Sequence, residues 1–143
     1  MRDGAVAAAI RRHRLIVVLR RVEPQDSLLA LADELAEAGA RAFEVTLDAP
    51  SGAASLAALR AHLDRRTDGP FVVGAGTVLG KGQLDAAARV GADFAVAPLL
   101  DAELVRAAVR QGIPVIPGAM TPTEIAAAWD AGATFVKLFP ASA

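Results

Sequence analysis

One short junction recurs along this chain of 143 residues and constrains its fold more than any other feature. Each copy is a glycine, closely followed by a run of apolar residues. The junction occurs in EAGARAFEVTL (37–47), RVGADFAVAP (89–98) and DAGATFVKLFP (130–140), and more loosely in RQGIPVIPG (110–118). Glycine adopts the left-handed conformation that ends a helix without a Cβ penalty, and a short apolar run is typical of a buried strand. Each junction therefore predicts a helix end followed by a strand.

The apolar runs predict six strands, and the alanine-rich stretches between them predict five helices. The strands are expected at 15–20, 42–47, 71–78, 94–98, 114–119 and 135–140, and the helices at about 25–38, 51–64, 81–90, 101–111 and 121–131. N-caps are expected at Asp26, Asp101 and Thr121, the last in a Thr-x-x-Glu capping box with Glu124 and with Pro122 at the first helical position. Strict alternation of strands and helices predicts a parallel sheet with right-handed crossovers.

An open doubly wound sheet and a closed TIM (βα)₈ barrel both fit this alternation. The glycines of GAGTVLG (74–80) are spaced G-x-G-x-x-x-G and fall within the third predicted strand, so they do not form the dinucleotide fingerprint of the open fold. Polar residues at the predicted strand ends favour the barrel, whose active sites lie at the C-terminal ends of the strands. We therefore predict one α/β barrel domain over residues 1–143, with the first six strand–helix units present.

Composition and charge limit the classes of ligand or partner that the chain is expected to bind. The formal net charge is -1, so no strong field selects nucleic acid or an anionic membrane, and a small-molecule ligand is expected. There is no cysteine, and His13 and His62 are the only histidines, which leaves no cluster for a transition metal. The apolar run 15–19 is shorter than the roughly 7–15 residues of a signal-peptide core, and no run approaches the roughly 20 of a membrane-spanning helix. We therefore expect an unprocessed cytoplasmic protein.

Lys137 stands inside an otherwise apolar predicted strand, where a buried ammonium group costs several kcal/mol. Side chains alternate between the two faces of a strand, and the face toward the barrel helices must be apolar. Val136 and Leu138 suit that helix-facing side, so Lys137 should point into the barrel. The same alternation turns Glu44 inward, because its neighbours on both sides are apolar. One lysine and one glutamate are thus expected in a common pocket.

Arg20 and Thr77 stand at the far ends of the first and third predicted strands and should reach the C-terminal mouth of the barrel. In an apolar pocket the neutral amine of Lys137 can attack a ketone to form a Schiff base, and Glu44 can move protons beside it. Arg20 and Thr77 can hold a substrate carboxylate. A plain structural interpretation stays open, with Lys137 and Glu44 as an ion pair, Arg20 as a solvated charge and Thr77 as an ordinary strand residue.

At these residues the chain resembles a known family, the class I 2-keto-3-deoxy-6-phosphogluconate (KDPG) and 4-hydroxy-2-oxoglutarate (KHG) aldolases, including their phosphogalactonate branch. Five motifs carry the resemblance, in the family's order and at about its spacing: IVVLR (16–20), FEVTLDAP (43–50), VGAGTV (73–78), PVIPGAMTPTE (114–124) and FVKLFPASA (135–143). After EVTL the phosphogluconate members often carry an arginine, whereas Asp48 here is more similar to the galactonate-type members.

The resemblance implies a reaction and a set of roles. The reaction is reversible cleavage of a 2-keto-3-deoxy(-6-phospho) sugar acid to pyruvate and an aldehyde such as glyceraldehyde 3-phosphate, through a covalent lysine imine and without a metal or other cofactor. A homotrimer is also implied. The roles fall on six residues: Lys137 as the Schiff-base lysine, Glu44 as the proton-transferring group, Arg20 and Thr77 at the pyruvate carboxylate, and Pro98 and Phe139 as lining of the pocket.

The family's barrel has eight strands and about 200 residues, so the resemblance implies a C-terminally incomplete barrel here. Two other functions therefore stand beside the aldolase. One is a catalytically inactive barrel remnant or partner-completing module. The other is a phosphate-binding isomerase or synthase, which the absence of the terminal phosphate-binding units disfavours.

Overall fold

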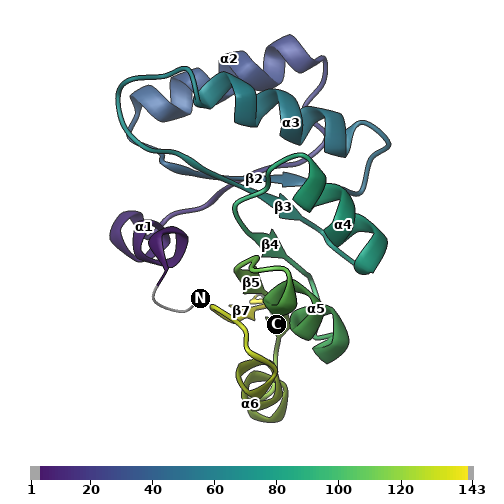
Figure 1. The fold of residues 1–143 in the computed structure, drawn as a ribbon. Coiled ribbons are helices and arrows are strands. Elements are labelled where there is room, and N and C mark those ends of the chain that lie inside the picture. The colour runs from purple at the N-terminus through teal and green to yellow at the C-terminus, as the bar shows by residue number, and fades with distance from the viewer. Residues whose placement is uncertain (1–3, 142–143) are drawn as a thin grey trace.

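Helices and strands alternate along the chain in the computed structural model, which describes residues 4–141. The helices are α1 (Ala5–His13), α2 (Gln25–Glu37), α3 (Gly52–Leu63), α4 (Lys81–Arg89), α5 (Ala102–Arg110) and α6 (Pro122–Ala131). The strands are β1 (Val17–Leu19), β2 (Ala42–Thr46), β3 (Val72–Gly76), β4 (Ala95–Val96), β5 (Val115–Ile116), β6 (Gly118–Ala119) and β7 (Lys137–Leu138). Figure 1 shows α2 to α6 following one side of the strands, with α1 on the other.

All strand pairs in the described residues are parallel, as predicted. One sheet has the order β1-β2-β3-β4-β5, and β6 and β7 form a second pair. The Thr134 N–H donates to the Val115 carbonyl and the Lys137 N–H to the Pro117 carbonyl, so backbone hydrogen bonds join the second pair to the first sheet. Parallel strands in sequential order bring the segments after β1, β2 and β3 together at one edge. The expected active-site end of the fold is therefore this edge.

The helix ends agree closely with the recurring junction. Gly39, Gly91, Gly112 and Gly132 all have positive φ, between 74° and 104°, after α2, α4, α5 and α6. The Thr121 capping box is formed in full, and the Asp101 carboxylate accepts from the N–H groups of residues 103 and 104. The prediction that Asp26 caps a helix was wrong. Pro24 occupies that position, and Asp26 lies in the first turn, where a carboxylate still interacts favourably with the helix dipole.

The structure also differs from the predictions at one helix and at several strands. Helix α1 was not expected at all, although its buried Ala7 and Ile10 have the spacing of an amphipathic helix. The expected strand 114–119 is divided into β5 and β6 at Pro117, which has no N–H to donate to a ladder. The expected strand 135–140 is reduced to two residues, and β3 ends at Gly76 because Thr77 has a φ of 56°. The number and order of the predicted helices from 25 onward are correct.

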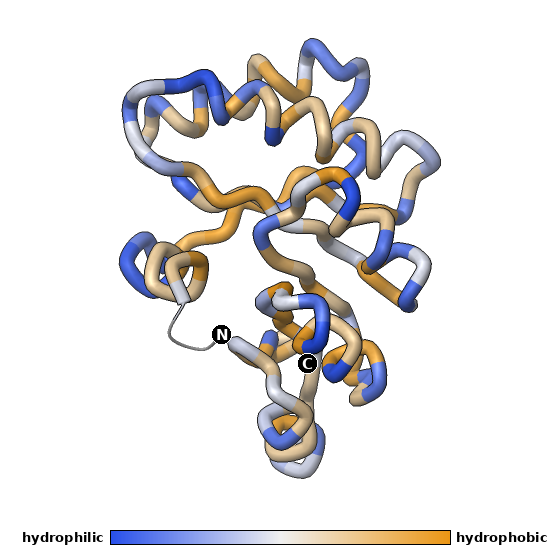
Figure 2. The backbone as a smooth tube through the Cα atoms, viewed as in Figure 1, coloured by the Kyte–Doolittle hydropathy of each residue, from blue (hydrophilic) through white to orange (hydrophobic). Residues whose placement is uncertain are grey.

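The core has two parts, one on each side of the sheet. The larger lies between the strands and α2 to α6 and includes Phe43, Val45 and Val73, which confirms that these faces point toward the helices. The smaller lies on the inner side and is made by Ile10 of α1 with Phe94, Val96 and Ile116. Helix α1 thus covers the inner side of the sheet, and Figure 2 shows the apolar residues concentrated along the strands and the adjoining helix faces.

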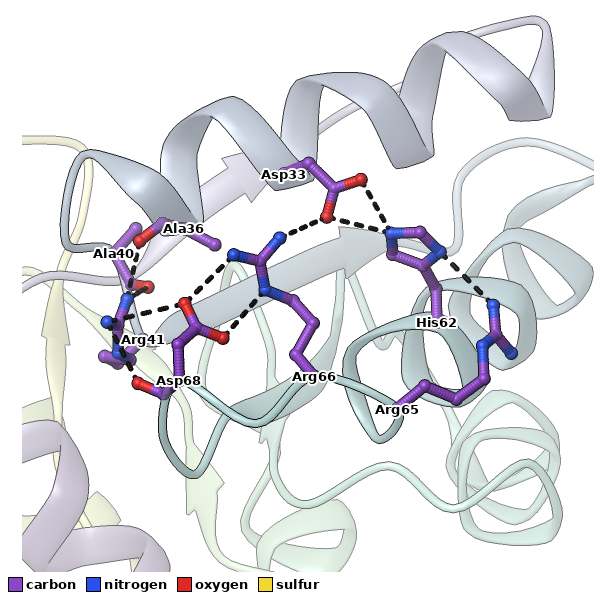
Figure 3. A network of polar contacts seen from close by, with 8 residues as sticks. All are labelled: Asp33, Ala36, Ala40, Arg41, His62, Arg65, Arg66 and Asp68. Carbon is purple, nitrogen blue, oxygen red and sulfur yellow. Dashed lines mark hydrogen bonds and ion pairs between the residues drawn. The ribbon is translucent and has the colours of Figure 1, made fainter.

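A polar network fastens α2 to α3 and to the loop before β3 (Figure 3). The Asp33 carboxylate on α2 contacts His62 Nε2 on α3 at 2.9 Å and accepts from Arg66 Nη1 at 2.6 Å. Arg66 also pairs with Asp68 at 2.9 Å, and Asp68 lies 3.8 Å from Arg41. His62 is therefore half-buried between two helices. This network holds the outer helices and is remote from the expected active-site edge.

None of the helices described by the structure is long and apolar enough to cross a membrane.

Candidate active site

The inner side of the sheet contains a cavity of about 320 Å³. Six apolar side chains line it together with one carboxylate and one amine: Ile10, Ile16, Val18, Val96, Ile116, Phe135, Glu44 and Lys137. Glu44 comes from β2 and Lys137 from β7, which are separated by more than ninety residues of sequence. The alternation of side chains along these strands correctly predicted that both groups point inward.

Glu44 is the more deeply buried of the two groups, with only 4% of its surface exposed. Burial raises the pKa of its carboxyl, and the positive charges of Lys137 and Arg20 partly oppose that rise. Its side chain extends over Gly76 on β3, where a Cβ would overlap the Glu44 carboxylate. The glycine in VGAGTV therefore creates the space that the glutamate occupies.

Lys137 is half-buried, and its Nζ lies 4.6 Å from the centre of the Phe139 ring, within reach of a cation–π interaction. Within residues 4–141, no carboxylate lies close enough to Lys137 for an ion pair. Lys137 and Glu44 share the cavity without direct pairing. The plain interpretation of these two residues as a structural ion pair is therefore not supported by their geometry.

Arg20 and Thr77 meet at the edge where the parallel strands end. Arg20 Nη2 donates to Thr77 Oγ1 at 3.1 Å, and Arg20 Nη1 donates to Asp48 Oδ2 at 2.7 Å. Strand alternation alone would have placed Thr77 with Ala75 on the helix-facing side. Its positive φ ends that alternation and turns the hydroxyl toward Arg20. Sequence reasoning did not assign Asp48 a place in this group.

Pro98 and Phe139 lie outside the set of residues that line the cavity. Pro98 is half-buried, and its carbonyl lies against Gly118, where a Cβ would overlap it. Phe139 is 42% exposed, and its ring lies beside Lys137 Nζ. Their contact with a substrate stays a prediction. Sequence reasoning did not assign any of the six apolar lining residues to the cavity, and Ile10 lies on helix α1, which was not expected.

No three side chains of His, Cys, Asp or Glu gather into a potential metal site anywhere in the described part of the chain. Among the described residues that line the cavity, Glu44 and Lys137 are the two with polar side chains. Such a cavity can bind a small ligand with one reactive carbonyl, because its walls are apolar and its two polar groups can exchange protons with the ligand.

Comparison with solved structures defines the class of protein first. The chain superposes with a TM-score of 0.83 on the 2-keto-3-deoxy-6-phosphogluconate aldolase of Zymomonas mobilis ZM4, at 32% identity, covering 99% of this chain and 63% of that one. It superposes with a TM-score of 0.79 on the KDPG aldolase from Legionella pneumophila, with pyruvate captured as a covalent carbinolamine intermediate, at 32% identity over 88% of this chain and 58% of that one. The fold is therefore that of a parallel α/β protein matching part of a TIM barrel.

Sequence comparison then defines the family. Residues 6–143 match the profile of the KDPG and KHG aldolases. A curated relative, the 2-dehydro-3-deoxy-6-phosphogalactonate aldolase of Escherichia coli K12, is 40% identical over 129 residues, which is 90% of this chain and 60% of that protein. The chain belongs to the KDPG and KHG aldolase family, as its five motifs indicate. It spans about 60% of the length of the curated relatives that it matches.

Proposed function

We propose that this chain carries the Schiff-base centre of a class I aldolase that reversibly cleaves a 2-keto-3-deoxy(-6-phospho) sugar acid to pyruvate and an aldehyde. The single observation that supports this most is the shared cavity of Lys137 and Glu44, with apolar walls and no ion pair between the two groups. Because Lys137 forms no ion pair with Glu44, its amine can attack a ketone. The buried Glu44 carboxyl, whose pKa is raised, can both donate and accept a proton.

The reaction begins when Lys137 Nζ attacks the C2 carbonyl carbon of the substrate and forms a carbinolamine. Glu44 donates a proton to the departing hydroxyl, water leaves, and a protonated imine remains. The Glu44 carboxylate then takes the proton from the C4 hydroxyl, the C3–C4 bond breaks, and its electrons pass into the imine to give an enamine. The aldehyde departs, Glu44 returns its proton to C3 of the enamine, and water hydrolyses the imine to release pyruvate and the free amine.

Two polar groups at the carboxyl ends of the strands support the proposed substrate class. Arg20 and Thr77 lie at the carboxyl ends of β1 and β3, the two strands that flank β2, and offer donors to the C1 carboxylate. The relatives named above act on 2-keto-3-deoxy acids of gluconate or galactonate type. The homotrimer and the cytoplasmic location implied by the resemblance remain predictions.

The test is release of pyruvate from a panel of 2-keto-3-deoxy acids, with and without a 6-phosphate and with either configuration at C4. Pyruvate is followed by its reduction with lactate dehydrogenase. We expect cleavage of at least one member of the panel and its loss in Lys137→Ala, while the exposed Lys81→Ala retains the activity. No cleavage of any member by the folded chain would contradict the proposal.

A second candidate, a partner-completing module without activity of its own, is favoured by one observation. Leu138 on β7 is 59% exposed, although strand alternation predicts that it faces a helix, and Phe139 beside it is 42% exposed. An apolar strand surface of this kind is typical of a side that another segment covers. A folded chain that gains cleavage activity only when a second polypeptide is added would favour this candidate over the first.

A further inference from the structure

Three loops converge at the carboxyl ends of β1, β2 and β3, and each contributes one polar residue. Arg20 follows β1, Asp48 follows β2, and Thr77 follows β3. Asp48 Oδ2 accepts from Arg20 Nη1 at 2.7 Å, and Thr77 Oγ1 accepts from Arg20 Nη2 at 3.1 Å. The two ends of one guanidinium group are therefore fixed by two different strand ends.

The conformation of Thr77 indicates that the surrounding fold imposes its contact with Arg20. Thr77 has a φ of 56°, and a β-branched residue rarely adopts the left-handed region because its Cβ substituents crowd the backbone. The fold nevertheless holds Thr77 there, and the consequence is a hydroxyl directed at Arg20 instead of at the helix layer behind β3.

Asp48 is the stronger of the two partners of Arg20. It also accepts from Arg21 Nε at 3.2 Å, so one carboxylate lies between two guanidinium groups. The Thr46 hydroxyl and, to a smaller degree, Arg20 and Arg21 lower the pKa of Asp48, which keeps it ionised. Two arginines and one aspartate leave a net charge of +1 at the mouth, which matches one substrate carboxylate.

The Arg20 side chain is 53% exposed, so without partners it would sample many rotamers. A guanidinium group has five N–H donors, and the two bonds above use two of them. The remaining three can bind a ligand only if the group is held in a suitable orientation.

We propose that Asp48 is a positioning residue, which holds the Arg20 guanidinium against Thr77 so that its remaining donors bind the carboxylate of the substrate. The proposal rests on the function proposed above. It places Asp48 outside the bond-making steps, since it acts on the substrate only through Arg20. It also explains how an acidic residue can stand at the mouth of a site for an anionic substrate.

The experiment measures imine formation by borohydride trapping and intact mass, as a function of ketone concentration. Pyruvate is compared with hydroxyacetone, a ketone of similar size without a carboxylate. In Asp48→Ala we expect the pyruvate concentration for half-maximal trapping to rise by about 1.5-fold to fivefold, the range for an exposed charged pair, and trapping with hydroxyacetone to stay unchanged. Asp48→Glu should recover most of the trapping of pyruvate that Asp48→Ala loses. Asp48→Asn removes the negative charge while the shape of the side chain stays the same.

Two controls make the result specific. Asp85→Ala removes an aspartate that forms a 2.7 Å ion pair with Lys81 on α4, away from the cavity. It should change trapping with neither ketone. In an Arg20→Ala background, Asp48→Ala should have no further effect on pyruvate, because Asp48 then has no guanidinium to position.

The possible outcomes distinguish a failure of the positioning role of Asp48 from a failure of the aldolase proposal. Trapping of pyruvate that is equally strong in Asp48→Ala and the unchanged chain would overturn the positioning role and leave the aldolase intact. Equal weakening with both ketones would also overturn it, because the effect would not depend on the carboxylate. No adduct with either ketone in the unchanged chain would overturn the aldolase proposal, and the positioning role with it.

Discussion

The Glu44 carboxylate lies directly over Gly76 of the neighbouring strand, in the space that a Cβ on residue 76 would fill. Gly74, two residues earlier on the same face of β3, gives the same room to the ring of Phe94. The glycines of VGAG thus serve the inner side of the sheet, one for the core and one for the proposed catalytic carboxylate. This relationship leads to a direct test.

Gly76→Ala should displace the Glu44 carboxylate and reduce pyruvate release to the level of Glu44→Ala. The overlap involves the movable end of a side chain, so we expect the free energy of unfolding to fall by only about 1–2 kcal/mol. Activity is measured by pyruvate release and stability by urea denaturation. Gly82→Ala on α4 is the matched control, because nothing lies within 4 Å of a Cβ there, and it should leave activity unchanged. Full activity in Gly76→Ala would show that the position of Glu44 does not matter.

Glu44→Gln should change how stability depends on pH. Burial raises the pKa of Glu44, so the folded chain holds this proton more tightly than the unfolded chain, where the pKa is near 4.5. The unchanged protein therefore loses stability as pH rises from the unfolded pKa through the folded one, and Glu44→Gln does not. The stability of Glu44→Gln relative to the unchanged protein should increase across that window and then level off.

Urea denaturation between about pH 4 and pH 8 measures this difference. Glu103→Gln, whose side chain is 78% exposed, is the control for loss of a carboxylate from the surface. A stability difference between Glu44→Gln and the unchanged chain that stays constant across this pH range would contradict the raised pKa of the buried Glu44 carboxyl. The same substitution should abolish pyruvate release, since an amide cannot move protons in the proposed steps.

Sequence patterns predicted the inward direction of Lys137 and Glu44 because side-chain alternation along a strand is fixed by geometry, and the apolar side chains of Phe43 and Val45 left no doubt about the helix-facing side. The glycine junctions predicted helix ends equally well, since positive φ is a local requirement that glycine meets best. These features depend on short segments of chain.

The features that sequence did not predict depend on contacts between distant segments. The left-handed φ of Thr77 opposes the preference of a β-branched residue, so only the packing around it and its bond to Arg20 account for it. Helix α1 was overlooked although six of its nine residues are apolar, and its role becomes visible only when Ile10 packs against Phe94 on the inner side of the sheet. Asp48 acquires a function only through Arg20, which lies twenty-eight residues away.

Thr121→Ala should destabilise the fold by about 1 kcal/mol, because it removes the side chain that caps α6. The Thr121 hydroxyl accepts from the Glu124 N–H at 3.2 Å, and the Glu124 carboxylate accepts from the Thr121 N–H at 2.8 Å. Thr121→Ser keeps the hydroxyl and should retain nearly all the stability. Thermal denaturation of the three chains checks this, and equal midpoints for Thr121→Ala and Thr121→Ser would contradict the capping role.

Asp33→Asn should weaken the network between α2 and α3 in Figure 3. The hydrogen bond from His62, followed by that from Arg66, lowers the pKa of Asp33, so its contribution is present above the unfolded pKa of 3.8 and is lost as pH falls through the folded value. Because the side chain is 35% exposed, we expect a loss below about 1 kcal/mol at pH 7.

Urea denaturation at neutral and acidic pH measures this loss, with Asp130→Asn on the exposed side of α6 as the control. A stability difference between Asp33→Asn and the unchanged chain that persists undiminished at acidic pH would show that the ionised carboxylate is not its cause. Imine formation should be unaffected, because the network lies outside the cavity.

Mapping the site of the imine tests whether Lys137 is the Schiff-base lysine. The chain contains only two lysines, Lys137 in the cavity and Lys81 on the surface of α4, with 69% of the Lys81 side chain exposed. Borohydride reduction in the presence of pyruvate, followed by peptide mass spectrometry, compares the two within one molecule. We expect modification of Lys137 at pyruvate concentrations that leave Lys81 unmodified. Equal modification of both lysines, or modification of Lys81 alone, would contradict it.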